Sequence, residues 1–171
     1  MVRPWLFLAT VFLSAIARAD TWIPAGAARV DISPSQSVRM MGYASRKSES
    51  EGVAQPIHAR ALALGDGTNA AVLITADNCI LPGWITEEVR RRLGAKAGIA
   101  PERVVLSVSH THSAPCLLGA APNIFVSEIS AAETNRIAAY TDFFVNRVEE
   151  VALAALDARD RKSTRLNSSH T

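Results

Sequence analysis

Alternation of apolar and polar residues predicts strands in the first half of the chain. Residues 27–33, "AARVDIS", show this pattern first. Residues 57–64, "IHARALAL", show it again, and an apolar run, "AAVLITADN", occupies residues 70–78. Asp66-Gly67 separates these two runs, and an Asp-Gly pair in that setting is a strong hairpin signal. We therefore expect one strand followed by a hairpin.

Helical spacing follows the hairpin. After Pro82, apolar residues recur every three or four positions until Gly98, a residue type that commonly ends helices. These apolar residues are Trp84 or Ile85, Val89 and Leu93. The next run, residues 104–108, is typical of a buried core strand. Because a helix would join this run to the strand around Ile74, we expect the two strands to pair in parallel.

A second helix is expected near the end of the working domain. Ser130 and Glu133 have the spacing of a capping box. An apolar stripe continues beyond them through Ile137, Tyr140, Phe144, Val148, Val151 and Leu156. The order strand, hairpin, helix, strand, helix predicts an α/β domain, with α+β possible, in which helices pack on a layered mixed sheet.

His110 and His112 stand on either side of Thr111 at the end of the run 104–108. If the strand continued through them, the two imidazoles would project from the same face. Neutral imidazole is a good zinc ligand, and a catalytic zinc takes three protein ligands and keeps one position for water. The pair therefore predicts a metal site or a polar catalytic pocket. The alternative is two histidines hydrogen-bonded at a sheet edge.

Other polar residues have two interpretations each. Cys79 and Cys116 could pair in an oxidising compartment or be two small buried residues, and Cys116 is conceivable as a further metal ligand. Asp77-Asn78 could support a histidine or could form a turn at the end of a strand. His58 is expected to be a polar residue at a strand edge. The polar, glycine-containing connection 37–56 is of a length that is often functional.

Neither end of the chain is expected to belong to the working domain. Residues 1–19 have the charged start, the short apolar stretch and the small residues of a secretory signal, so we expect cleavage after Ala19 and a periplasmic or secreted protein; an uncleaved anchor is the alternative. The aperiodic segment 160–171 resembles the translation of a common DNA sequencing adapter, and we expect it to be non-native. This leaves residues 20–159.

The net charge changes when these ends are removed. The whole chain has 18 basic and 16 acidic residues and a formal net charge of +2. The ends contribute Arg3, Arg18, Arg161, Lys162, Arg165 and Asp160. Residues 20–159 therefore keep 13 basic and 15 acidic residues, a net charge of −2. They contain no basic stripe with interleaved aromatic residues, so we expect no binding to nucleic acid.

Five segments in order, "AGAARVDISP", "RMMGYA", "IHARALAL", "LITADN" and "RVVLSVSHTHSAP", resemble the N-terminal part of the neutral/alkaline non-lysosomal ceramidase family. The resemblance implies a zinc-dependent amidase that cleaves the N-acyl bond of ceramide, a lipid, to a sphingoid base and a fatty acid. It implies that His110 is a zinc ligand and that His112 is a catalytic residue facing the substrate. The remaining ligands, a histidine, a glutamate and a tyrosine, would lie downstream, so residues 20–159 would be an incomplete part of a larger catalytic domain, inactive by itself.

One departure from the family keeps other functions open. Members with ceramidase activity tend to be glycine-rich after the histidine motif, whereas this chain reads "SAPCLLGAAPN". An exported sibling hydrolase acting on another amide or ester is therefore an alternative. A noncatalytic exported module that binds lipid or glycan is another. A lipid substrate would also allow peripheral contact with a membrane, and the oligomeric state stays open.

Overall fold

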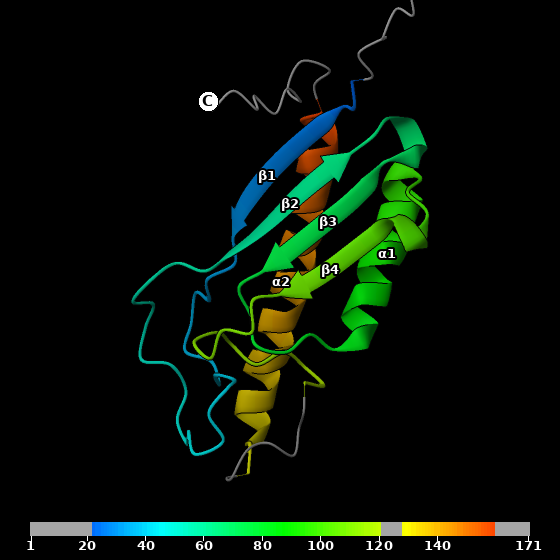
Figure 1. The fold of residues 1–171 in the computed structure, drawn as a ribbon. Helices are drawn as coiled ribbons and strands as arrows, with labels where there is room; N and C mark the ends of the chain where they lie inside the picture. The colour runs from blue at the N-terminus through cyan, green and yellow to red at the C-terminus, as the bar shows by residue number, and fades with distance from the viewer. Residues whose placement is uncertain (1–21, 121–127, 160–171) are drawn as a thin grey trace, which may run out of the picture.

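The computed structural model describes residues 22–120 and 128–159. Its centre is a four-stranded sheet in the order β1 (Ala25–Asp31), β2 (His58–Leu64), β3 (Ala71–Ala76) and β4 (Val104–Val108) (Figure 1). β2 is antiparallel to both β1 and β3, and β4 pairs with β3 in parallel. The mixed sheet and the parallel pairing are confirmed. The expected signal segment and the expected non-native tail lie outside the described residues.

The connections follow the predicted turn and helix signals. The β2–β3 hairpin is confirmed, although Gly67–Asn69 form a short 3₁₀ helix rather than a two-residue turn. α1 (Gly83–Ala97) joins β3 to β4 through a second 3₁₀ turn, Pro101–Arg103, and ends where Gly98 takes up a left-handed conformation with φ 66°. α2 spans Ala131–Asp157. None of the helices in the described part of the chain is long and apolar enough to span a membrane.

The start of α2 has the predicted capping box. The hydroxyl of Ser130 accepts a hydrogen bond from the backbone N–H of Glu133, and the Glu133 carboxylate accepts one from the backbone N–H of Ser130 at 2.9 Å. The apolar stripe of the helix then packs into the core: Ile137, Tyr140, Phe144, Val148, Val151 and Leu156 are all buried. The sequence prediction of this helix is confirmed.

The core lies between one face of the sheet and the two helices, with α2 running behind β1 and β2 (Figure 1). The β2 residues that face α2 are alanines: Ala59, Ala61 and Ala63. β1 contributes Gly26, where an added Cβ would lie 2.2 Å from the carbonyl oxygen of Ala155. The helix therefore lies very close to the sheet, because these residues have little or no side chain.

The opposite face of the sheet is open among the described residues. Leu62, Leu73 and Val105 are aligned across three strands by the pairing register and are 39%, 43% and 53% exposed. The expectation that β4 is a core strand is therefore wrong for Val105, because the helices of the described residues cover only one face of the sheet. Of the two candidates in α1, Ile85 is buried and Trp84 is exposed.

Candidate metal centre

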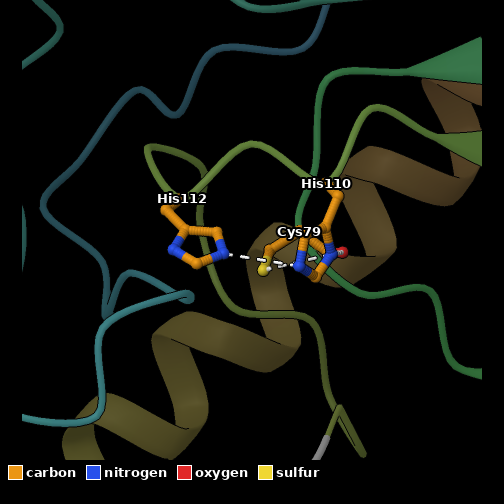
Figure 2. Close-up of side chains that lie close together, drawn as sticks. All are labelled: Cys79, His110 and His112. Atoms are coloured by element: carbon orange, nitrogen blue, oxygen red, sulfur yellow. Dashed lines mark hydrogen bonds between the residues drawn. The ribbon is translucent and has the colours of Figure 1, made fainter.

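The two histidines follow the end of β4, where the carboxyl ends of β3 and β4 lie at the same edge of the sheet (Figure 1). β4 stops at Val108, and His110 has a positive φ of 58°, so the chain turns before Thr111. The expectation that a continuing strand places both imidazoles on one face is therefore wrong. The turn nevertheless brings them together, because Nε2 of His110 and Nε2 of His112 are 3.4 Å apart (Figure 2).

The hydrogen bonding of His110 determines which ring nitrogen is free. Its Nδ1 lies 2.8 Å from the carbonyl oxygen of Cys79. A carbonyl only accepts hydrogen bonds, so Nδ1 carries the proton and donates it. In the neutral imidazole the free lone pair is then on Nε2, the atom that faces His112. This is the usual arrangement of a metal-binding histidine, in which the other ring nitrogen is held by a carbonyl or carboxylate.

The spacing of the imidazole nitrogens fits a metal ion. Two nitrogens bound tetrahedrally at about 2.0–2.1 Å from one zinc ion are about 3.4 Å apart. The observed Nε2–Nε2 separation of 3.4 Å is the same. One donor atom from each of Cys79, His110 and His112 lies within 4.8 Å of the other two. The donor set and its spacing therefore suit a metal ion of the size of zinc. These residues offer at most three donors, fewer than the four of a structural zinc site.

The cysteines follow one of the two interpretations that the sequence left open, because both are small buried residues. Both are free, so no disulfide joins them. Cys116 donates its thiol to the carbonyl of Leu117 at 3.5 Å and is not part of the group of potential metal ligands, so the idea that it is a ligand is not supported. Cys79 takes that place in the cluster instead. Burial raises the pKa of the Cys79 thiol, and raises that of Cys116 to about 11, so both thiols are protonated at neutral pH.

Asn78 links the end of β3 to the histidine loop. It is fully buried, its backbone carbonyl accepts from the N–H of Thr111 at 3.2 Å, and its side-chain amide donates to the carbonyl of Pro115 at 3.1 Å. Its side-chain oxygen accepts from the backbone N–H of Cys79 at 2.7 Å. Asn78 therefore holds both ends of the loop and the residue that orients His110. These contacts are with backbone groups, and Asn78 reaches His110 only indirectly, through the backbone of Cys79.

The neighbouring polar residues have structural contacts of their own. The carboxylate of Asp77 accepts from the backbone N–H of His58 at 2.9 Å and pairs with Arg60 at 3.2 Å. His58 is the first residue of β2, an inner strand of the sheet. The structure does not bring Asp77 or His58 into the group of potential metal ligands.

The long connection after β1 forms a wall of the site. Gly42, which has a φ of 112°, packs directly against His112. The ring of Tyr43 meets the His112 ring edge-on, with centroids 5.1 Å apart, and Arg46 donates to the backbone carbonyl of His112 at 3.3 Å. The length of this connection and its "RMMGYA" element are visible in the sequence. Its contacts with His112 are not, because they join residues about 70 positions apart.

A buried arginine fixes this wall to α2. Arg39 is 1% exposed, and its guanidinium donates to the carbonyls of Arg46, at 2.7 Å, and Lys47. It also pairs with the carboxylate of Glu133 at 3.3 Å. Glu133 belongs to the capping box, so the start of α2, the connection and the His112 wall form one continuous set of polar contacts.

A cavity of about 570 Å³ lies on the Thr111 side of the histidine loop. The long connection contributes apolar lining from Met40, Val53 and Pro56. β2 contributes Arg60, and the residue after β3, Asp77, also lines the cavity. Its volume is within the usual range of ligand pockets, about 300–1,000 Å³. A small amphipathic molecule would therefore fit beside the histidine loop.

Comparison with known proteins agrees with this architecture. Residues 24–153 match the family model described as neutral/alkaline non-lysosomal ceramidase, N-terminal. The solved structure "Ceramidase complexed with C2" has a TM-score of 0.63 at 22% identity, over 83% of this chain and 22% of its own. The neutral ceramidase from Pseudomonas aeruginosa has a TM-score of 0.64 at 22% identity, over 84% of this chain and 23% of its own.

These likenesses to solved structures, at their low identity, show a shared fold, and the chain spans about a fifth of their length. The family model covers most of the chain, including β1–β4, α1, the histidine loop and nearly all of α2. The chain therefore belongs to the neutral/alkaline non-lysosomal ceramidase family and comprises its N-terminal region.

Proposed function

We propose that this chain is the N-terminal part of an exported zinc-dependent amidohydrolase that cleaves the N-acyl bond of ceramide-like lipids, releasing a sphingoid base and a fatty acid. The observation that carries the proposal is the pair of facing Nε2 atoms, 3.4 Å apart, in a chain of this family. The family supports the hydrolase class. The histidine geometry supports the metal.

His110 would hold the metal through Nε2, because its Nδ1 is already bonded to the carbonyl of Cys79. Zinc bound there supplies a water molecule whose pKa is lowered to about 7 and a Lewis acid for the amide carbonyl. The further ligands would come from parts of the enzyme downstream of this chain. The contribution of the chain itself is a pre-oriented ligand, whose tautomer and ring direction are fixed by the strand end at Cys79.

His112 would act on the substrate side of the same centre. Its Nε2 lies 3.4 Å from Nε2 of His110 and could also reach the ion, but the family resemblance implies that it faces the substrate instead. Its ring is held by Tyr43 and Gly42. A neutral imidazole at this place can take up a proton as the amide is attacked and return it to the departing amine nitrogen. Its firm packing serves that role, because proton transfer needs donor and acceptor at hydrogen-bond distance.

The test uses the intact gene product, with bound zinc and hydrolysis of an N-acyl sphingosine measured separately. His110→Ala should lose both zinc and turnover. His112→Ala should keep most of the zinc while kcat falls by about 10²-fold or more. His58→Ala, a histidine outside the cluster, is the matched control and should change neither. Stoichiometric zinc and normal turnover in both cluster variants would overturn the proposal.

The same assay addresses the alternative substrates. A panel of N-acyl amides and acyl esters tests for a sibling hydrolase, which would cleave another member of the panel in preference to ceramide. The cavity beside Thr111 is the observation that favours a noncatalytic binding module. Such a module would bind a lipid or glycan without zinc and without turnover, and its binding would be insensitive to His110→Ala.

A further inference from the structure

The thiol of Cys79 has no role in the reaction proposed above, yet it lies inside the histidine cluster. Its Sγ is 3.9 Å from Nδ1 of His110, the ring nitrogen that donates to the Cys79 carbonyl and therefore does not bind a metal. One donor atom from each of the three residues lies within 4.8 Å of the other two. Figure 2 shows the sulfur between the two imidazole rings. Cys79 is 3% exposed, so this position is set by the packing around the end of β3 and not by a mobile surface side chain.

The backbone of Cys79 is fixed on both sides. Its N–H donates to the side chain of Asn78 at 2.7 Å, and its carbonyl accepts from His110 at 2.8 Å. A residue held in this way loses little additional conformational freedom when its side chain binds a ligand. The second cysteine, Cys116, donates its thiol to a backbone carbonyl and is not part of the cluster. The two cysteines are therefore a natural test pair.

One thiolate and two imidazoles form a soft, nitrogen- and sulfur-containing donor set. We propose that Cys79, His110 and His112 form a three-donor site for thiophilic divalent cations such as Cd²⁺, a binding mode separate from the catalytic use of His110. On binding, the S–H bond of Cys79 breaks, a metal–sulfur bond forms and the proton passes to water. A sulfur and a nitrogen on one tetrahedral zinc-sized ion are about 3.6 Å apart, and they lie further apart on a larger cation such as Cd²⁺. Because the donor atoms already lie within 4.8 Å of one another, the cluster has to contract by about 1 Å at most.

The proposed mode makes the enzyme sensitive to soft metals. An ion held by all three donors occupies Nε2 of His112, the atom that the proposed reaction needs free for proton transfer. Thiophilic cations are therefore inhibitors that act through Cys79. This consequence rests on the proposed function, whereas the binding site itself does not.

The experiment titrates Cd²⁺ into the intact gene product after removal of resident metal, by calorimetry and by near-ultraviolet thiolate-to-cadmium absorption. Wild-type protein should bind one ion per chain and develop that absorption. Cys79→Ser should abolish the absorption and weaken cadmium binding by about tenfold or more. Even the loss of a residue that only supports a metal ligand weakens metal binding by about 10–100-fold. Cys116→Ser should retain both. Cys79→Ala is a second variant, and circular dichroism verifies its fold.

The outcomes separate the two proposals. Cadmium bound without thiolate absorption, or absorption that disappears in Cys116→Ser and persists in Cys79→Ser, overturns the cadmium site. If zinc and N-acyl hydrolysis still depend on His110, the proposed function stands in that case. Conversely, Cys79-dependent absorption in a protein that neither needs zinc nor cleaves an N-acyl bond supports the site and removes the proposed function.

Discussion

Gly42 lies so close to His112 that a Cβ atom at position 42 would be 2.6 Å from each of Cα, Cβ and Cγ of the histidine. Real Cβ atoms do not approach other atoms this closely, so any other residue at position 42 has to move the histidine or the connection that carries it. The φ of 112° at Gly42 is also one that residues with a side chain rarely adopt.

Gly42→Ala should therefore damage the site and the fold together. A strained backbone conformation costs about 1–3 kcal/mol, and displacement of a catalytic group by about 1 Å can reduce turnover about 10²-fold. We expect a lower Tm, and a fall in kcat with bound zinc largely retained. Gly52→Ala is the matched control, because an added Cβ at Gly52 meets nothing within 4 Å. Equal behaviour of the two variants would show that the Gly42 contact does not matter.

Asn78→Ala should loosen the histidine loop. It removes the amide that donates to Pro115 and the oxygen that accepts from Cys79. Each buried partner left unsatisfied costs about 1–3 kcal/mol. We expect lower stability in urea and faster zinc loss to a chelator. Asn69→Ala, an exposed asparagine in the β2–β3 hairpin, should resemble wild type. Zinc retention equal to wild type in Asn78→Ala would show that Asn78 does not position His110.

Arg39→Met should be among the most destabilising single changes. It removes a buried guanidinium that serves two carbonyls of the long connection and the carboxylate of Glu133. Breaking a buried ion pair by removal of one partner costs about 3–5 kcal/mol. Chemical denaturation measures the loss. Arg91→Met, which removes a 68% exposed arginine from a surface pair, is the control and should leave Tm nearly unchanged. A small effect of Arg39→Met would mean that water replaces its hydrogen bonds.

The capping box of α2 should make stability depend on acid pH. Hydrogen bonds from Ser130 lower the pKa of the Glu133 carboxyl below its usual value of 4.5, with a smaller contribution from Arg39. A lowered folded-state pKa gives stability that is present above the unfolded pKa and is lost as the pH falls through the folded one. Unfolding in urea should therefore become easier as the pH falls below about 4.5.

Glu133→Gln isolates this contribution, because glutamine can still occupy the N3 position of a capping box. The variant should be less stable than wild type near pH 7, and the difference should shrink as the pH falls through the acid range. Glu128→Gln, a change at an exposed residue just before the helix, is the control. A difference between Glu133→Gln and wild type that stays constant across the acid range would contradict the assignment.

Local signals predicted the elements of the fold well. The Asp66-Gly67 turn, the stop at Gly98 and the Ser130 cap act over a few residues, so a sequence contains all the information that they need. The exposure of Val105 was missed, because burial of the second sheet face depends on what covers it and not on the strand's own apolar residues.

The proximity of the two histidines was predicted, but for an incorrect geometric reason. The spacing of His110 and His112 suggested that they meet, but a left-handed turn at His110 joins them and not strand alternation. The entry of Cys79 into the cluster could not be predicted, since it depends on the parallel register of β3 and β4 across 31 residues. The contact between Gly42 and His112 joins residues that are even further apart in the sequence, so it could not be predicted either.

The open sheet face makes alternate positions of the same strands respond differently to mutation. Inward-facing alanines on β2 leave no room for a larger residue beside α2. Replacement of one of them by a larger residue, polar or apolar, should therefore destabilise the fold. The opposite face carries Leu62, Leu73 and Val105. When this chain is expressed by itself, charged or polar replacements at these positions should be neutral or should improve solubility. A mutational scan would therefore find that every second position along β2 and β3 accepts polar residues without loss of stability. If polar residues at the same outward positions destabilised the intact gene product, this alternation would be absent, and the scan would indicate that another layer covers this face.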